Sequence, residues 1–192
     1  RIRFAEDVSR RATQANALPM KPGDLLNLRD IEQALENFRR VPTATVDIKI
    51  TPAEDAKALN ASDLVISWQQ SRLFRLSAFA DDSGSRTTGK YQGGITLSLD
   101  HPLALNDLFY ITLNHDMGGG MAGDRGTRGH TLYYSLPYAN WLFSATYNAF
   151  HYHQNMPRAF KHNDYRGKSE NNEIKLNRLL YRSRALKTTA AL

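Results

Sequence analysis

The stretch Tyr91-Gln92-Gly93-Gly94-Ile95-Thr96-Leu97-Ser98-Leu99-Asp100 decides the fold class of this chain. Apolar residues dominate one set of alternate positions and polar residues the other, which is the period of two that an extended strand gives its side chains. A strand of about ten residues is also long enough to cross a bilayer when it is tilted. The stretch therefore predicts a strand with one apolar face and one polar face.

Segments on both sides of this stretch repeat the alternation. They are residues 74–80, 109–114, 131–136, 141–149 and 173–182, and the last is the weakest because Arg178 stands among its apolar positions. Short connectors at 101–107 and 137–140 take turns with longer ones at 82–90, 118–129 and 155–171. Short turns on one side and long loops on the other are typical of outer-membrane β-barrels. A soluble antiparallel sheet with one wet face is the alternative.

The first seventy or so residues have a different, mixed periodicity. The spacing of Phe4, Val8 and Ala12 predicts a helix from Phe4 to Ala17. A second helix is predicted to begin after Asn27, a good N-cap residue with Asp30 in a position like that of a capping box, and to end at Arg39-Arg40 before Val41-Pro42.

Two strands are expected to follow these helices. Residues 45–50 alternate cleanly and residues 63–69 place Leu64, Ile66 and Trp68 on one side. A small two-layer α+β domain is expected over residues 1–70, completed by a first strand that this chain lacks. Residues 71–192 then form antiparallel transmembrane β-barrel strands.

Composition excludes several other classes of protein. The 192 residues include no cysteine, which rules out disulfides, thiolate metal sites and cysteine nucleophiles. The formal net charge is +6 and the isoelectric point is near 9.6, but the basic residues are scattered, so no nucleic-acid partner is expected. No apolar run approaches the ~18–20 residues of a spanning helix.

Both ends of the chain resemble cut ends. The sequence opens on Arg1, no signal peptide is visible, and the last residues look like the start of a strand. A membrane barrel must close, and the smallest single-chain barrels use about eight strands. We therefore expect further strands beyond Leu192.

Several motifs resemble those of one transporter family. Residues 22–37, Pro-Gly-Asp-Leu-Leu-Asn-Leu-Arg-Asp-Ile-Glu-Gln-Ala-Leu-Glu-Asn, are similar to the second POTRA domain of two-partner secretion transporters, the TpsB family. Arg40-Val41-Pro42 is similar to that domain's helix ending. Asp82-Ser83-Gly84 with Thr88-Gly89-Lys90-Tyr91-Gln92 resembles the loop between the family's first two barrel strands.

Leu97-Ser98-Leu99-Asp100-His101-Pro102-Leu103-Ala104-Leu105-Asn106-Asp107 resembles a turn of the same family. Two residues of this turn depart from the family pattern: Ala104 stands at a usual glycine and His101 at a usual asparagine. The segment 54–63 also lacks an expected glycine. The overall similarity is greatest to the contact-dependent-inhibition type.

The resemblance implies a function without a catalytic residue, a cofactor or a metal. Members of this family recognise a TpsA-type exoprotein in the periplasm and pass it, unfolded, through a barrel in the outer membrane. The implied partners are that exoprotein and outer-membrane lipid or lipopolysaccharide. The implied location is the outer membrane, with the N-terminal part in the periplasm.

Two sets of residues are candidates for this work. Cargo docking by addition of a strand to a sheet edge would use the polar face of the strand at 45–50, namely Thr45, Asp47 and Lys49. Residues predicted to line a channel are Arg75, Gln92, Thr96, Asn114 and Asn148.

The sequence gives little support for a metal site or a phosphate-binding loop. His151 and His153 share a strand face, as metal ligands do, but no third ligand is evident. The glycine-rich segment 118–123 lacks the Lys-Ser/Thr of a phosphate-binding loop and is expected to be a flexible surface loop. The functional alternatives are a BamA-like barrel assembly factor, a passive porin and a soluble β-rich binding module.

Overall fold

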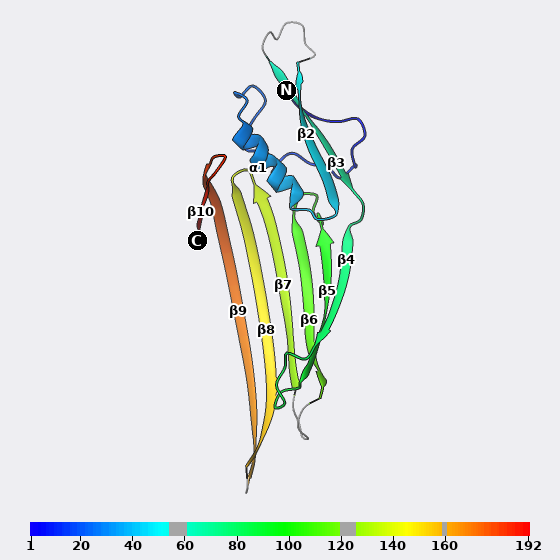
Figure 1. Ribbon diagram of the computed structural model, residues 1–192, viewed down its shortest axis with the longest axis vertical. Coiled ribbons are helices and arrows are strands. Elements are labelled where there is room, and N and C mark those ends of the chain that lie inside the picture. Colours follow the sequence, from blue (N-terminus) through cyan, green and yellow to red (C-terminus); the bar gives the residue numbers. More distant parts are fainter. Residues whose placement is uncertain (54–60, 120–125, 159–160) are drawn as a thin grey trace.

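A computed structural model describes residues 1–53, 61–119, 126–158 and 161–192. A small domain with one helix and a three-stranded sheet lies at one end, and a long seven-stranded sheet extends away from it (Figure 1). No helix among the described residues is long and apolar enough to cross a membrane.

The three-stranded sheet has the order β1-β3-β2. Its strands are β1 (Ile2–Phe4), β2 (Ala44–Pro52) and β3 (Ser62–Gln70). Strand β3 pairs antiparallel with β2 and parallel with β1. The strands predicted at 45–50 and 63–69 are therefore confirmed, and β2 is an edge strand of the described sheet.

Helix α1 (Leu28–Arg39) packs over this sheet. Asn27 is its N-cap, with the side-chain oxygen accepting a hydrogen bond from the Arg29 backbone N–H at 3.0 Å, and the basic side chain of Arg39 lies in the last turn, where it complements the helix dipole. The helix predicted after Asn27 is confirmed. Its buried face joins the core of the domain, which contains Ala17, Ala34, Phe38, Val41, Val46, Ile66 and Trp68.

The helix predicted from Phe4 to Ala17 is wrong. Residues 2–4 form β1, and the chain from Ala5 to Ala17 follows the sheet as an irregular segment. The backbone N–H groups of Ala5 and Ser9 donate to carbonyls of β3 at 2.9 and 3.1 Å, so pairing with another element replaced the intrahelical bonds. Phe4, Val8 and Ala12 still pack against the core. Strand β1 is also the first strand that the sequence analysis expected this chain to lack.

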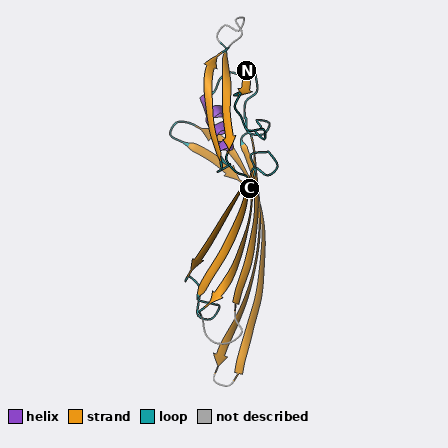
Figure 2. Cartoon of the chain, turned by 90° about the vertical axis from the view of Figure 1, so that its right-hand side faces the viewer, coloured by secondary structure: helices purple, strands orange, loops and turns teal. Residues whose placement is uncertain are grey.

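The long sheet is an antiparallel meander in chain order, β4 to β10. Its strands are β4 (Phe74–Asp81), β5 (Tyr91–Asp100), β6 (Leu108–Gly118), β7 (Gly126–Tyr138), β8 (Trp141–Arg158), β9 (Lys161–Arg182) and β10 (Lys187–Ala191). All the alternating segments therefore form strands. Seen from the side, the strands leave the small domain together and spread into a twisted fan (Figure 2).

The long loop predicted at 155–171 is wrong. Strands β8 and β9 remain paired without interruption from Trp141 opposite Arg178 to Arg158 opposite Lys161. The polar composition of this segment resembled a loop, but two polar strands can satisfy each other's backbone groups beyond an apolar band. Of the loop predicted at 118–129, Gly118 belongs to β6 and residues 126–129 belong to β7, and residues 120–125 lie outside the described residues. Residues 54–60 also lie outside them.

Candidate functional site

The register of the long sheet sorts its side chains onto two faces. Residues opposite each other in neighbouring strands point to the same face. One set of rungs is mainly apolar, for example Leu76, Leu97, Ile111, Leu132 and Tyr147 in neighbouring strands. The other set is mainly polar, for example Ser77, Thr96, Thr112, Thr131 and Asn148. We call these the apolar face and the polar face.

All five residues predicted to line a channel lie on the polar face. Arg75, Gln92, Thr96, Asn114 and Asn148 belong to cross-strand rungs of that face. The hydroxyl groups of Thr96 and Thr112 are 2.8 Å apart, and the Thr131 hydroxyl donates to Asn148 Oδ1 at 2.8 Å. These contacts form a polar lining across adjacent strands, and the channel role of the five residues stays a prediction.

Arg75 also has a structural role, because it forms an ion pair with Asp100. Its guanidinium makes two bonds to the carboxylate of Asp100, at 2.8 and 3.0 Å, and the Asp100 side chain is fully buried. This bidentate pair lies at the end of β4 and β5 next to the small domain, where Gln70 Nε2 also donates to the Asp100 carbonyl at 2.9 Å. Arg75 therefore anchors the start of the sheet as well as facing the polar side.

The side chains of the candidate docking strand β2 alternate between the solvent and the core of the domain. Thr45, Asp47 and Lys49 are exposed, whereas Val46 is buried and Ile48 is half-buried against the core. Because β3 pairs with only one side of β2, the backbone groups on the other side of β2 have no strand partner among the described residues. The arrangement leaves an edge to which another extended segment can add.

A dense hydrogen-bond network, which no sequence pattern predicted, joins the small domain to the turns of the long sheet. Arg11 donates to the carbonyls of His101 and Pro102 at 2.6 and 2.7 Å. Asn16 donates to the carbonyls of Leu105 and Pro137, the latter at 2.8 Å. We call this contact the junction. Because side chains from an irregular segment bond to backbone carbonyls far along the chain, no local pattern could have revealed it.

Further bonds complete the junction from helix α1. Asn37 donates to the carbonyl of Ala139 at 2.8 Å, and Arg40 donates to the hydroxyl of Ser135 at 3.1 Å. Glu36 accepts bonds from Arg182 and from Lys187 Nζ, the latter at 2.6 Å. Burial raises the pKa of Glu36, but the bonds from Lys187 and Arg182 outweigh it and hold that pKa below its usual value. The helix is thus tied to the end of β7, to the β7–β8 turn and to the residues where β9 ends and β10 begins.

The turn between β5 and β6 has a demanding backbone conformation. His101, Ala104 and Asn106 have φ angles of 65°, 60° and 53°, in the left-handed region that favours glycine and asparagine. The Asp107 carboxylate accepts bonds from the backbone N–H groups of Leu103 and Leu105, which closes the turn. Glycine at position 104 and asparagine at position 101, the residues expected there from the resemblance, would therefore suit this backbone better than Ala104 and His101.

Replacing Ala104 with glycine should stabilise the turn. A left-handed residue with a Cβ costs about 1–2 kcal/mol, and the greater freedom of glycine in the unfolded chain offsets part of that gain. We expect Ala104→Gly to slow hydrogen exchange at residues 101–107 by several-fold. Ala15→Gly is the control, since Ala15 is exposed and has no positive φ. Equal effects of the two substitutions would contradict this account of the turn.

His101, which stands where the resemblance leads us to expect asparagine, makes hydrogen bonds through both of its ring nitrogens. Its Nδ1 accepts a bond from the Asn106 N–H at 2.8 Å, and its Nε2 bonds to the Arg11 carbonyl at 2.9 Å. These two partners require a neutral ring protonated at Nε2. The ring is fully buried and lies 4.9 Å from that of Trp68, centroid to centroid. Burial lowers the pKa of His101, although the bond to Arg11 opposes this.

The junction should consequently weaken in acid. Because the folded pKa of His101 is below its unfolded value near 6.5, the neutral ring stabilises the fold above that pH. This contribution is lost as the pH falls through the folded pKa. We expect faster proteolysis around residues 101–107 below about pH 6.5, and His101→Asn should remove this dependence. Persistence of the same profile in His101→Asn would contradict the role of the ring.

Within the described ranges, no group of three or more His, Cys, Asp or Glu side chains is placed to hold a metal ion. His151 and His153 do share one face of β8, at successive rungs. The described residues therefore combine an open strand edge, a polar sheet face and a hydrogen-bonded junction between them.

Comparison with known proteins assigns this combination to a family. The model of the haemolysin secretion/activation proteins ShlB/FhaC/HecB matches residues 60–192, and a POTRA domain model matches residues 1–52. The chain belongs to the ShlB/FhaC/HecB family. Its small domain is a POTRA domain, and its long antiparallel sheet is part of a barrel wall of the kind found in that family.

Named relatives cover most of this ShlB/FhaC/HecB chain. The outer membrane transporter CdiB-2 of Burkholderia pseudomallei is 35% identical over 95% of the chain, and the hemolysin transporter protein ShlB of Serratia marcescens is 28% identical over 72%. The chain spans 30% and 24% of the length of these two relatives.

Solved structures agree with the family assignment. CdiB from Escherichia coli superposes with a TM-score of 0.82 at 26% identity, over 94% of this chain and 33% of that one. CdiB from Acinetobacter baumannii gives 0.77 at 28% identity, over 98% of this chain and 35% of that one.

Proposed function

We propose that this chain belongs to an outer-membrane translocator that recognises a partner exoprotein in the periplasm and exports it through its β-barrel. The partner would be of the TpsA type, as in haemolysin secretion or contact-dependent inhibition. The protein resides in the outer membrane, with the POTRA domain on the periplasmic side. We place the boundary between the POTRA domain and the barrel wall near residue 70.

One observation carries the proposal. A POTRA domain with an open edge strand is hydrogen-bonded directly onto the turns of a sheet that has one polar and one apolar face. The polar face would line the route of export through Arg75, Gln92, Thr96, Asn114 and Asn148. The apolar face would contact lipid, including lipopolysaccharide.

Docking would occur by strand addition to β2. An unfolded cargo segment has its own backbone groups free to bond, and such pairing requires little from the cargo sequence. The exposed residues Thr45, Asp47 and Lys49 would then contact alternate residues of the cargo, because they share one face of the strand.

Cysteine cross-linking tests the docking edge, since this chain has no cysteine of its own. Single cysteines at Thr45, Asp47 or Lys49 in the full transporter should form disulfides with a cysteine-scanned cargo, with a period of two along the cargo. Glu6→Cys is the control, because Glu6 is exposed and follows β1 at the other edge of the sheet. Equal cross-linking at Glu6, or none at β2 during active export, would overturn the docking role.

A further inference from the structure

A row of basic side chains crosses four strands of the long sheet at a single level. His115, Arg128, His151 and Lys168 are successive cross-strand partners on β6, β7, β8 and β9. They lie on the apolar face, because the rung two residues nearer the POTRA domain contains Ile95, Leu113, His130 and Ala149. We call these four residues the basic row.

The basic row brings two cations to one level of the sheet, and they differ in whether they have an ion-pair partner among the described residues. Arg128 and Lys168 lie two strands apart in this row, with His151 between them. Lys168 is paired with Glu170 at 2.5 Å. Arg128 is exposed and forms no ion pair with any residue in the described part of the chain. The middle of the row therefore offers a guanidinium to an external anion.

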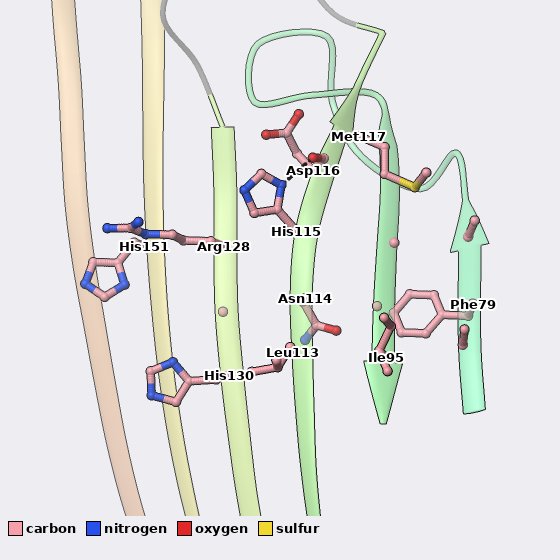
Figure 3. Close-up of a pocket in the computed structure, with 15 residues that line it drawn as sticks. Phe79, Ile95, Leu113, Asn114, His115, Asp116, Met117, Arg128, His130 and His151 are labelled. Carbon is pink, nitrogen blue, oxygen red and sulfur yellow. Dashed lines mark hydrogen bonds between the residues drawn. The ribbon is translucent and has the colours of Figure 1, made fainter. Parts of the chain in front are cut away.

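Two hollows flank the basic row, and both are bordered by Arg128, His115 and His151. The one nearer the POTRA domain has a volume of about 720 Å³ and a small apolar floor. In that floor lie Ala78, Ala80 and Gly93, with Ile95 and Leu113 beside them, as Figure 3 shows for the labelled members. Met117 lies over Gly93, where a Cβ would come within 2.5 Å of its sulfur.

The second hollow lies on the far side of the row and is more polar than the first. Its volume is about 490 Å³, and its lining includes His153 and Arg166, which lie on the same face as the row. Arg166 Nε lies 3.3 Å from His153 Nε2 and its side chain is exposed. An apolar hollow, the basic row and a more polar hollow thus follow one another along the strands.

The position of the basic row relative to the apolar residues of the sheet indicates which part of the membrane would surround it. On β8 the band runs from Trp141 to Ala149, which is about 27 Å of strand at ~3.4 Å per residue, and His151 comes next. The row is at the end of this band remote from the POTRA domain and its turns (Figure 1). In an outer membrane with the POTRA domain in the periplasm, that end lies at the headgroups of the outer leaflet.

We propose that the basic row and its two hollows bind a phosphorylated glycolipid of the outer leaflet, the lipid A part of lipopolysaccharide. A phosphate would bind Arg128, which can donate two parallel hydrogen bonds to it. An acyl chain would lie in the apolar hollow and the sugar would face Arg166. This assignment rests on the proposed membrane orientation and specifies the lipid contact of the proposed function.

Lipid binding by the full-length transporter in detergent tests the proposal. Native mass spectrometry should show bisphosphorylated lipid A bound to the wild type, and dephosphorylated lipid A bound at least about tenfold more weakly, as expected for losing one charge-assisted bond. Arg128→Gln should cause a loss of similar size, and Arg128→Lys should restore part of it.

Arg178→Gln is the matched control, because Arg178 lies on the same face opposite Trp141, at the POTRA end of the band. Equal binding of the two lipids, loss of binding in Arg178→Gln as large as in Arg128→Gln, or equally tight binding of inorganic phosphate alone would overturn the site. A heat-modifiable band establishes that each variant is folded.

Export of the partner, measured in the same strains, separates this site from the proposed function. Phosphate-dependent lipid binding by a transporter that exports no protein would overturn the proposed function and leave the site standing. Normal export without phosphate-dependent lipid binding would overturn the site alone.

Discussion

Leu97→Arg should prevent most of the full-length transporter from assembling in the outer membrane. Leu97 lies on a middle rung of the apolar face, between Leu76 and Ile111. A charged side chain facing lipid near the bilayer midplane costs about 2–4 kcal/mol, which corresponds to a decrease of roughly 30- to 1,000-fold in the equilibrium for insertion. The measurement is the amount of heat-modifiable, folded protein in isolated outer membranes.

Thr96→Arg is the control for this experiment, one residue away on the opposite face. The Thr96 hydroxyl faces Thr112 across the polar side, where a charge remains in water. Thr96→Arg should assemble normally and change the ion conductance of the protein in planar bilayers. Equal assembly of both variants, or equal failure, would show that the two faces are assigned wrongly.

Trp68→Ala should cause the largest loss of stability in the POTRA domain. The indole is fully buried among core residues that include Phe38 and Ile66, and its ring lies tilted against that of His101 at the junction. Removing a large buried aromatic side chain costs about 3–5 kcal/mol, because the surrounding structure cannot close the cavity. Hydrogen exchange of the β3 amides should therefore accelerate by about two to three and a half orders of magnitude.

Trp68→Phe separates the packing from the indole N–H. The Nε1 atom has no hydrogen-bond partner in the described structure, so a phenylalanine loses volume but leaves no new unpaired group. We expect it to cost far less than Trp68→Ala. If Trp68→Phe accelerated exchange as much as Trp68→Ala, the indole N–H, and not core packing, would be the important group.

Local pattern was sufficient to predict most strands and one helix. In the strand from Tyr91 to Asp100, alternation and burial on one face lead to the same register, since a slip by one residue would move every apolar side chain to the other face. Helix α1 was equally predictable, because Asn27, the apolar stripe and Val41-Pro42 define its start, its face and its end.

The local sequence pattern gave wrong predictions where a different element supplied the hydrogen-bond partners of the backbone. Phe4, Val8 and Ala12 have helical spacing, yet β3 accepts the hydrogen bonds of Ala5 and Ser9. The segment 155–171 has the composition of a loop, yet its two arms pair with each other. In both cases the deciding hydrogen bonds join residues whose relationship the local sequence does not encode.

The sequence by itself determined that this chain has two parts, which residues of the barrel wall share a face, and which family motifs it carries. Side-chain period and capping are local properties, so these conclusions needed no distant contact. Only the tertiary structure decided that Arg11 and Asn16 fasten the POTRA domain to the turns at Leu105 and Pro137, and that four basic residues form one row. These arrangements depend on which strands are neighbours and in which register, and those relations arise only when the whole chain minimises its unpaired backbone groups and exposed apolar surface together.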